Sequence, residues 1–317
     1  MDTLRYSPKE LTCLSRRTGF YSAGTWCAAT LHRPAKACDE SLPAILMLHG
    51  WGGIQDAMTA SYVEEFTRAG YAVMSFDYRG WGDSAGMPRQ VISAHQRVVD
   101  GDAALAFLKS QEGIDPRRIV LWGTSFGGGH AVQLAAEHPE LAGVIAQVPM
   151  LDGLAAVKAV PLTRLLRFGV YALADLLKPG HPLYLPVVSE RGGFSSMDRD
   201  DANKALTLAE ISMGWRYDNR VAARSLLTMA PYRPVRHLKN IRIPTLLLGA
   251  SNDSVAPFVE SAIHAVGNPN LTLASIDANH FEPYFEPVFT DVISQQLDFL
   301  SRIFSPGCTP SNLASAI

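Results

Sequence analysis

The pattern Gly-x-Ser-x-Gly occurs twice in the sequence, at residues 123–127 around Ser125 and at residues 82–86 around Ser84. This pattern can form a tight strand-to-helix turn that holds a serine hydroxyl clear of the backbone, where it can attack a carbonyl carbon. The flanking glycines are needed because side chains at those positions would clash within the turn. Each copy is therefore a candidate for a nucleophilic serine.

The residues around the two copies distinguish them. Ser125 directly follows the apolar run 118–122 and precedes the helix-like stretch 128–138, as a strand–turn–helix requires. Ser84 follows a loop-like stretch and is followed by Pro88, which argues against a helix that starts directly after the serine. We therefore predict that Ser125 is the nucleophile and that Ser84 belongs to a structural turn.

The elements that must position these residues follow from the hydrophobic pattern. Apolar runs alternate with amphipathic stretches over most of the chain, which is typical of a parallel sheet with helices between its strands. We expect parallel strands at residues 44–49, 71–76, 118–122, 141–148, 245–249 and 271–276, preceded by two antiparallel strands between residues 11 and 34. Helices are expected at residues 57–69, 95–110, 128–138, 261–266 and 288–304.

The alternation stops between residues 151 and 233, where leucines recur at helix-like intervals and prolines interrupt the middle. We interpret residues 151–233 as a largely helical insertion, a lid or cap, in a core formed by residues 1–150 and 234–304. Residues 305–317 contain mainly small and polar residues, and we expect them to form a flexible tail.

The chain resembles the α/β-hydrolase superfamily in five places: residues 49–53 (HGWGG), 77–84 (DYRGWGDS), 123–128 (GTSFGG) and 249–253 (GASND), and His280. The resemblance implies a mostly parallel central sheet flanked by helices, and acyl-transfer chemistry on a serine. Within the superfamily, the chain resembles dienelactone-hydrolase-related enzymes and the free-standing hydrolases that release or transfer polyketide chains. It departs from true dienelactone hydrolases, whose nucleophile is a cysteine.

A serine hydroxyl is a poor nucleophile at neutral pH, so it needs a base and an acid that orients the base. The resemblance implies the chain order serine, acid, histidine. Of the 9 histidines, only His280 lies between the last predicted strand and the final predicted helix, so it is the predicted base. Asp253 follows the strand at residues 245–249 and is the predicted acid, although it could instead cap a helix. Asp152, at the start of the insertion, and Asp277, close to the histidine, are the alternatives.

Acyl transfer builds negative charge on the carbonyl oxygen, and backbone N–H groups aimed at that oxygen lower the barrier. The resemblance implies that the amides of Trp51 and Phe126 are these two donors. The glycines beside Trp51 let its loop fold back toward the serine. The alternative is that the Trp51 ring only packs in the core, which would leave the role of its amide unchanged.

The insertion falls where lids occur in this fold, so its apolar residues are candidates for a substrate pocket. The predicted lining residues are Leu162, Leu165, Leu166, Phe168, Tyr171, Tyr184, Met213 and Trp215. They predict a medium-sized and mostly apolar substrate. Arg164, Arg167 and Arg216 either meet a carboxylate or phosphopantetheine phosphate, or form a solvated surface.

Three functions remain open. The first is hydrolysis of a carboxylic ester, thioester or lactone through an acyl-enzyme on Ser125. The second is an acyltransferase or lactone-forming, polyketide-releasing enzyme with the same acyl-enzyme, and the third is a non-catalytic ligand-binding protein. The expected partner is a small acyl substrate, which a carrier protein or coenzyme A could present as a thioester; the oligomeric state is left open.

Composition limits the classes of function further. Hydrophobic residues make up 47% and charged residues 18%, which is typical of a folded chain with a large core. A formal net charge of -2 argues against nucleic-acid binding. The 4 cysteines form no Cys-x-x-Cys pair, so no metal site is expected, and the chemistry needs no cofactor. We expect a cytoplasmic protein without a membrane span, because no apolar segment is long enough.

Overall fold

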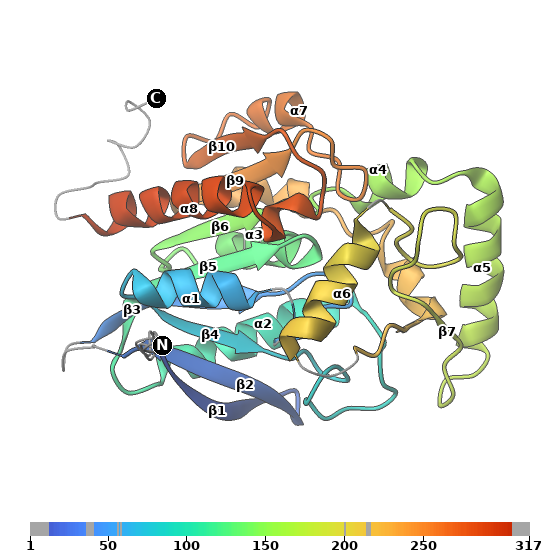
Figure 1. Cartoon of the computed structure of the whole chain (residues 1–317), viewed down its shortest axis with the longest axis horizontal. Helices are drawn as coiled ribbons and strands as arrows, with labels where there is room; N and C mark the ends of the chain where they lie inside the picture. The colour runs from blue at the N-terminus through green and yellow to red at the C-terminus, as the bar shows by residue number, and fades with distance from the viewer. Residues whose placement is uncertain are drawn as a thin grey trace, which may run out of the picture.

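The computed structural model describes residues 13–35, 41–55, 57, 59–199, 201–213 and 217–305. Its main sheet is built from β1 (Cys13–Ser22), β2 (Thr25–Pro34), β3 (Leu42–Leu48), β4 (Ala72–Phe76), β5 (Ile114–Thr124), β6 (Gly143–Gln147), β9 (Thr245–Ala250) and β10 (Leu271–Ile276). The strand order is β1-β2-β4-β3-β5-β6-β9-β10 (Figure 1). β2 runs antiparallel to β1 and β4, and the other neighbours are parallel. The mostly parallel sheet predicted from the sequence is therefore confirmed.

Helices cover both faces of the sheet, because successive strand residues point to opposite faces. On one face, α1 (Ala60–Arg68) and α8 (Val288–Phe304) contribute to the buried cluster that contains Met47 of β3. On the other face, α2 (Ala94–Lys109) and α3 (Phe126–Glu137) contribute to the cluster that contains the adjacent Leu46. Since β3, β5 and β9 are parallel, the segments after their carboxyl ends meet at one edge of the sheet.

The insertion, residues 151–233, lies between β6 and η2 (Pro234–Asn240), a 3-10 helix that leads to β9. Its helices are α4 (Gly153–Lys158), α5 (Leu162–Leu176), α6 (Ala202–Met213) and the 3-10 helix η1 (Ala223–Thr228). Figure 1 shows α5 at the right-hand edge of the molecule. β7 (Tyr184–Leu185) and β8 (Val221–Ala222) form a small antiparallel pair. The sequence did not predict this pair, because two-residue strands leave no periodic signal.

The remaining helices lie in the last part of the chain. They are α7 (Glu260–His264) and the 3-10 helix η3 (Glu282–Tyr284), which precedes α8. The expected flexible tail lies almost wholly outside the described residues, which end at Ser305.

Candidate active site

Ser125 occupies a sharp turn between β5 and α3. Its backbone has φ 55° and ψ −123°, a region that residues with a side chain rarely adopt. A Cβ at Gly123 would collide with the carbonyl of Gly127, and a Cβ at Gly127 would collide with the carbonyl of Leu48. Gly123 is thus required by a contact within the turn and Gly127 by the close approach of β3, and the turn holds the serine at the carboxyl edge of the sheet.

The structure brings the three predicted triad residues together from three different loops. His280 Nε2 lies 2.9 Å from Ser125 Oγ, and His280 Nδ1 lies 2.6 Å from Asp253 Oδ2. The other carboxylate oxygen of Asp253 accepts hydrogen bonds from the amides of Val255 at 2.8 Å and Ala256 at 2.7 Å. The carboxylate is therefore fixed, and it favours the histidine tautomer that leaves Nε2 free to accept the serine proton.

The alternative acids have other partners. Asp152 caps α4 through the amides of Leu154 and Ala155, and it forms an ion pair with Arg233 at 2.6 Å. Asp277 accepts hydrogen bonds from Ser251 and Asn252. Neither carboxylate is bonded to His280 in the described part of the chain, so the geometry favours Asp253 as the orienting acid.

The second Gly-x-Ser-x-Gly copy forms a structural connection. Ser84 is only 2% exposed. Its hydroxyl donates to the carbonyl of Asp77 at 2.5 Å and accepts a hydrogen bond from the amide of Ala28 at 2.8 Å. The first bond closes the loop after β4 on itself and the second ties this loop to β2, which fits the structural turn expected for Ser84.

The loop after β3, residues 49–53, passes directly beside the serine. A Cβ on Gly50 would lie 3.0 Å from the Cβ of Ser125, so only a glycine backbone can approach this closely. The carbonyl of Gly50 accepts hydrogen bonds from the amide of Gly53 at 3.2 Å and from Arg97 Nη1 at 2.8 Å. Tyr217, from the insertion, donates its hydroxyl to the carbonyl of Gly52. Core and insertion therefore both hold this loop.

The two predicted oxyanion donors belong to segments next to Ser125: Phe126 follows it in the chain, and Trp51 follows Gly50, which approaches it. Phe126 is the first residue of α3, where backbone N–H groups have no acceptor within the helix. Trp51 follows Gly50, and its indole Nε1 donates to Ser196 Oγ at 3.1 Å. Within the described ranges, neither the Trp51 amide nor the Phe126 amide donates a hydrogen bond to a protein group. Both are therefore available to an oxygen bound beside Ser125.

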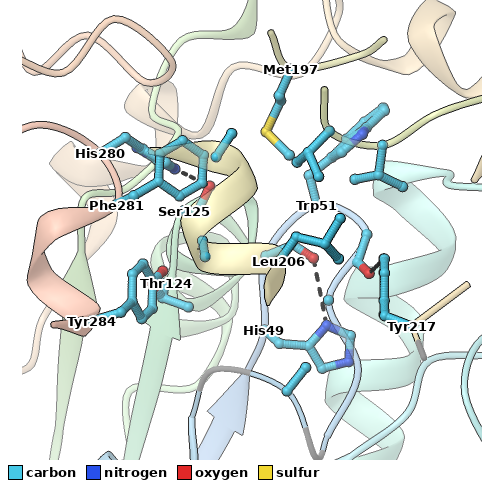
Figure 2. Close-up of a pocket in the computed structure, with 18 of the residues that line it drawn as sticks. His49, Trp51, Thr124, Ser125, Met197, Leu206, Tyr217, His280, Phe281 and Tyr284 are labelled. Carbon is cyan, nitrogen blue, oxygen red and sulfur yellow. Dashed lines mark hydrogen bonds between the residues drawn. The ribbon is translucent and has the colours of Figure 1, made fainter. Parts of the chain in front are cut away.

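Two cavities meet at the serine. The smaller has a volume of about 90 Å³ and is lined by Ser125 and His280 from the core and by Met197, Leu206 and Tyr217 from the insertion (Figure 2). The larger has a volume of about 280 Å³ and extends under α4, α5 and η1, where it is lined mainly by apolar side chains. Trp51, Ser125 and Met197 border both cavities. The serine is thus accessible from two mostly apolar spaces.

The predicted lining residues on α5 divide between its two faces. Leu165 and Phe168 line the larger cavity. Leu162 and Leu166 are 71% and 63% exposed and line neither cavity. Tyr171 is 41% exposed and contacts the ring of Phe194 instead. Both faces of α5 are apolar, and the helical period alone could not tell which face turns inward.

Of the other three predicted lining residues, one lines neither cavity and two lie wholly or partly outside the described residues. Tyr184 lies in β7, lines neither cavity, and donates its hydroxyl to the carbonyl of Arg89 at 3.1 Å. The side chain of Met213 and the whole of Trp215 lie outside the described residues. The sequence interpretation missed Met197, Leu206 and Tyr217, which carry no local signal because they reach the serine only through the folding of the insertion.

The arginines of the insertion hold its own loops together. Arg164 forms an ion pair with Asp198 at 2.5 Å and donates to the carbonyls of Gly193 and Ser195. The guanidinium of Arg167 lies 4.2 Å from the centre of the Phe194 ring. Arg216 lies outside the described residues. Arg164 is thus neither a solvated residue nor free to meet a substrate anion.

Among the residues that the structure describes, no helix has the length and hydrophobicity of a membrane-spanning segment. The same residues contain no group of three or more His, Cys, Asp and Glu side chains that could hold a metal ion.

A mostly parallel sheet of this strand order, with a serine in the turn after β5, defines the α/β-hydrolase fold. The chain belongs to the serine aminopeptidase S33 family of hydrolases, which matches residues 39–283.

The relatives extend this assignment. The chain is 38% identical over 288 residues to the quorum-quenching protein AidA of Acinetobacter baumannii (strain MDR-ZJ06), covering 90% of this chain and 93% of AidA. It is 25% identical to the polyketide transferase grgF of Penicillium sp, covering 82% and 88%. The crystal structure of the α/β hydrolase GrgF from Penicillium sp. sh18 has a TM-score of 0.73 at 23% identity, covering 91% and 98%. The predicted resemblance to polyketide-transferring enzymes is confirmed.

Proposed function

We propose that this protein is a serine hydrolase that cleaves a carboxylic ester, thioester or lactone through an acyl-enzyme on Ser125. The observation that carries the proposal is the continuous hydrogen-bond chain from Ser125 through His280 to Asp253, which opens into two apolar cavities. A buried and correctly ordered triad in a cavity is an arrangement for nucleophilic catalysis. Its completeness argues against a non-catalytic ligand-binding protein.

The reaction follows from the positions of the groups. Ser125 Oγ attacks the carbonyl carbon while His280 Nε2 accepts the hydroxyl proton, and Asp253 stabilises the resulting imidazolium. The amides of Trp51 and Phe126 bind the negatively charged oxygen of the tetrahedral intermediate. His280 then donates its proton to the leaving oxygen or sulfur. In the second half, His280 activates water, which attacks the acyl-enzyme and releases the carboxylic acid.

The two cavities divide the substrate between them. The leaving group must lie beside His280, because this histidine delivers its proton. His280 lines the smaller cavity and is absent from the lining of the larger one, whose walls include Phe168, Ala172 and Leu165. The smaller cavity therefore takes the leaving group, and the larger one takes an apolar acyl chain. Because the insertion lines both cavities, residues 151–233 act as the lid of the site.

A second function uses the same acyl-enzyme. The smaller cavity is lined largely by apolar groups, among them Val187, Leu206 and Phe281, and such a cavity favours an alcohol over bulk water. An alcohol or amine bound there would accept the acyl group, which would make the protein an acyltransferase or a lactone-forming enzyme. Incubation with substrate and increasing alcohol separates the two functions: a hydrolase releases acid, whereas an acyltransferase diverts the acyl group to the new ester.

Hydrolysis is tested with the purified protein and a panel of p-nitrophenyl esters, acyl-coenzyme A thioesters and acyl lactones. We expect turnover of at least one class, with preference for an acyl chain longer than acetyl. Loss of all turnover in Ser125→Ala is the control for contaminating esterases. If the wild-type protein turns over no member of any class, the proposed function is wrong.

Gly169 offers a test of the acyl pocket. It lies within α5, lines the larger cavity, and a Cβ built there meets no atom within 4 Å. Gly169→Leu should therefore fill the cavity without a clash and shift the preferred acyl chain toward shorter lengths. Each excluded methylene should cost about 0.8 kcal/mol, a factor of about four in kcat/KM, while acetate hydrolysis stays nearly unchanged.

The chain provides matched controls for this experiment. Gly180 also has open space around its Cβ position but does not line the cavity, so Gly180→Leu should leave the chain-length profile unchanged. Leu166→Ala should likewise leave it unchanged, because Leu166 is exposed. A profile that moves with Leu166→Ala but not with Gly169→Leu would place the acyl chain outside the larger cavity.

A further inference from the structure

Arg97, on α2, is a buried arginine that forms an ion pair with no carboxylate of the described residues. It is 2% exposed. Its Nη1 donates to the carbonyl of Gly50 at 2.8 Å, while its Nε and Nη2 have no hydrogen-bond partner in the described part of the chain. The nearby carboxylate of Asp100 is already paired with Arg79 and Ser22. Burying an unpaired guanidinium is costly, so this arrangement persists only if something compensates for it.

Two aromatic rings hold the Arg97 side chain in place, and its guanidinium stays positively charged. Its guanidinium carbon lies 4.4 Å from the centre of the Tyr78 ring and 5.3 Å from that of Trp81, which are cation–π distances. Burial lowers the pKa of Arg97 to about 10, so it stays protonated at neutral pH. Burial, and then the charge of Arg97, lower the pKa of the neighbouring His49 to about 3, so this histidine is neutral. A single cation is thus held on an aromatic surface against the loop after β3.

The bond from Arg97 acts on the peptide unit that carries a predicted oxyanion donor. The carbonyl of Gly50 and the amide of Trp51 belong to one planar trans peptide, so they point in opposite directions. A cation that holds the carbonyl on one side therefore sets the direction of the N–H on the other side. It also draws electron density toward the carbonyl oxygen, which makes that N–H a stronger donor.

We propose that Arg97 is a positioning residue, whose guanidinium holds the Gly50 carbonyl and so aims the Trp51 amide at the oxyanion formed on attack by Ser125. This inference rests on the proposed function. The amide of Gly53 and, at 3.5 Å, Nδ1 of His49 also contact the Gly50 carbonyl, but both belong to residues 49–53, whereas Arg97 links this loop to α2. A lysine would not replace the arginine, because its compact ammonium cannot stack on Tyr78 and donate along the same direction.

The first test compares wild type with Arg97→Met, using the best substrate of the panel. Removal of one oxyanion-hole donor typically lowers kcat by about 10²–10³-fold, and we expect a loss of about 10²-fold with KM changed little. A trifluoromethyl ketone that carries the same acyl chain forms a charged hemiketal with Ser125. Its affinity should fall by a factor similar to that in kcat/KM, because its oxygen occupies the same hole.

Controls separate positioning from a role in stability. Rates are expressed per serine labelled by a fluorophosphonate, so unfolded protein does not count. Arg224→Met removes another arginine that is mostly buried, but one that pairs with Asp175 and lines neither cavity; it should lower Tm without lowering kcat. If Arg97→Met does not fold, Arg97→Ala and Arg97→Lys replace it. Millimolar guanidinium should partly restore kcat in Arg97→Ala, whereas Arg97→Lys should keep the low kcat.

The possible results distinguish a failure of the proposed role of Arg97 from a failure of the proposed function. A wild-type protein that is neither labelled nor active overturns both. If the wild type is active and Arg97→Met lowers Tm without changing kcat per labelled serine or the affinity for the ketone, the proposed function stands and only the role of Arg97 is wrong. A rise in KM at constant kcat also overturns it, since that pattern means lost substrate binding rather than a misdirected donor.

Discussion

Ser125→Ala should remove turnover of every substrate in the panel and all labelling by a fluorophosphonate probe. In the proposed mechanism the hydroxyl oxygen forms the acyl-enzyme, and His280 has no other hydroxyl within hydrogen-bond distance in the described part of the chain. In a serine protease template, loss of the nucleophile lowers kcat by about 10⁶-fold, and we expect a loss of that order here. Mass spectrometry of the labelled peptide and steady-state rates measure the two effects.

Ser84→Ala is the matched control, because it changes the same residue type in the same sequence pattern. Its hydroxyl links Asp77 to the amide of Ala28, so the variant should melt at a lower temperature yet keep both labelling and kcat. Labelling that survives in Ser125→Ala and disappears in Ser84→Ala would mean that the nucleophile is the other serine.

Asp253→Asn should lower kcat by about 10⁴-fold, as in the triad template, while KM changes little. The asparagine can keep the shape of the site, but it favours the wrong histidine tautomer and cannot stabilise the imidazolium. The carboxylate now contacts His280 Nδ1 at 2.6 Å, so both effects are lost at once. Steady-state kinetics on the best substrate measures the change.

Asp152→Asn is the control, since Asp152 was the alternative acid. It caps α4 and pairs with Arg233 in a half-exposed setting, so its replacement should alter stability slightly and leave kcat within a few-fold of wild type. The reverse ranking of the two variants would assign the acid to the start of the insertion.

Local steric and hydrophobic rules made the core of this protein predictable. The bounds expected for β10 and α8 agree with the structure, because β10 is a short apolar run and α8 has the strong period of a helix that packs one face on the sheet. The setting of Ser125 was predictable for a similar reason. The two glycines of the motif lie within two residues of the serine in the sequence, so the pattern is visible before the chain folds, although the contact that requires Gly127 is made by the distant Leu48.

The parts that could not be predicted depend on contacts between distant segments. Tyr217 and Leu206 reach the smaller cavity only because the insertion folds back over residues 49–53. The two apolar faces of α5 look equally suited to burial, yet Phe168 is buried and Leu166 is exposed. From the sequence alone, Arg97 looks like an ordinary polar residue of a surface helix. Its significance comes from the carbonyl beside it, which lies in another segment.

Two hydrogen bonds connect the insertion to the loop after β3. Tyr217 donates its hydroxyl to the Gly52 carbonyl, and Ser196 accepts a hydrogen bond from the Trp51 indole. Val187 also lies where a side chain on residue 52 would be, so the two segments fit only as a pair. Replacement of residues 151–233 by the corresponding segment of a relative would remove these contacts and release residues 49–53 beside Ser125. Under the proposed function, we therefore expect single substitutions such as Gly169→Leu to change the acyl preference with less loss of activity than replacement of the whole segment.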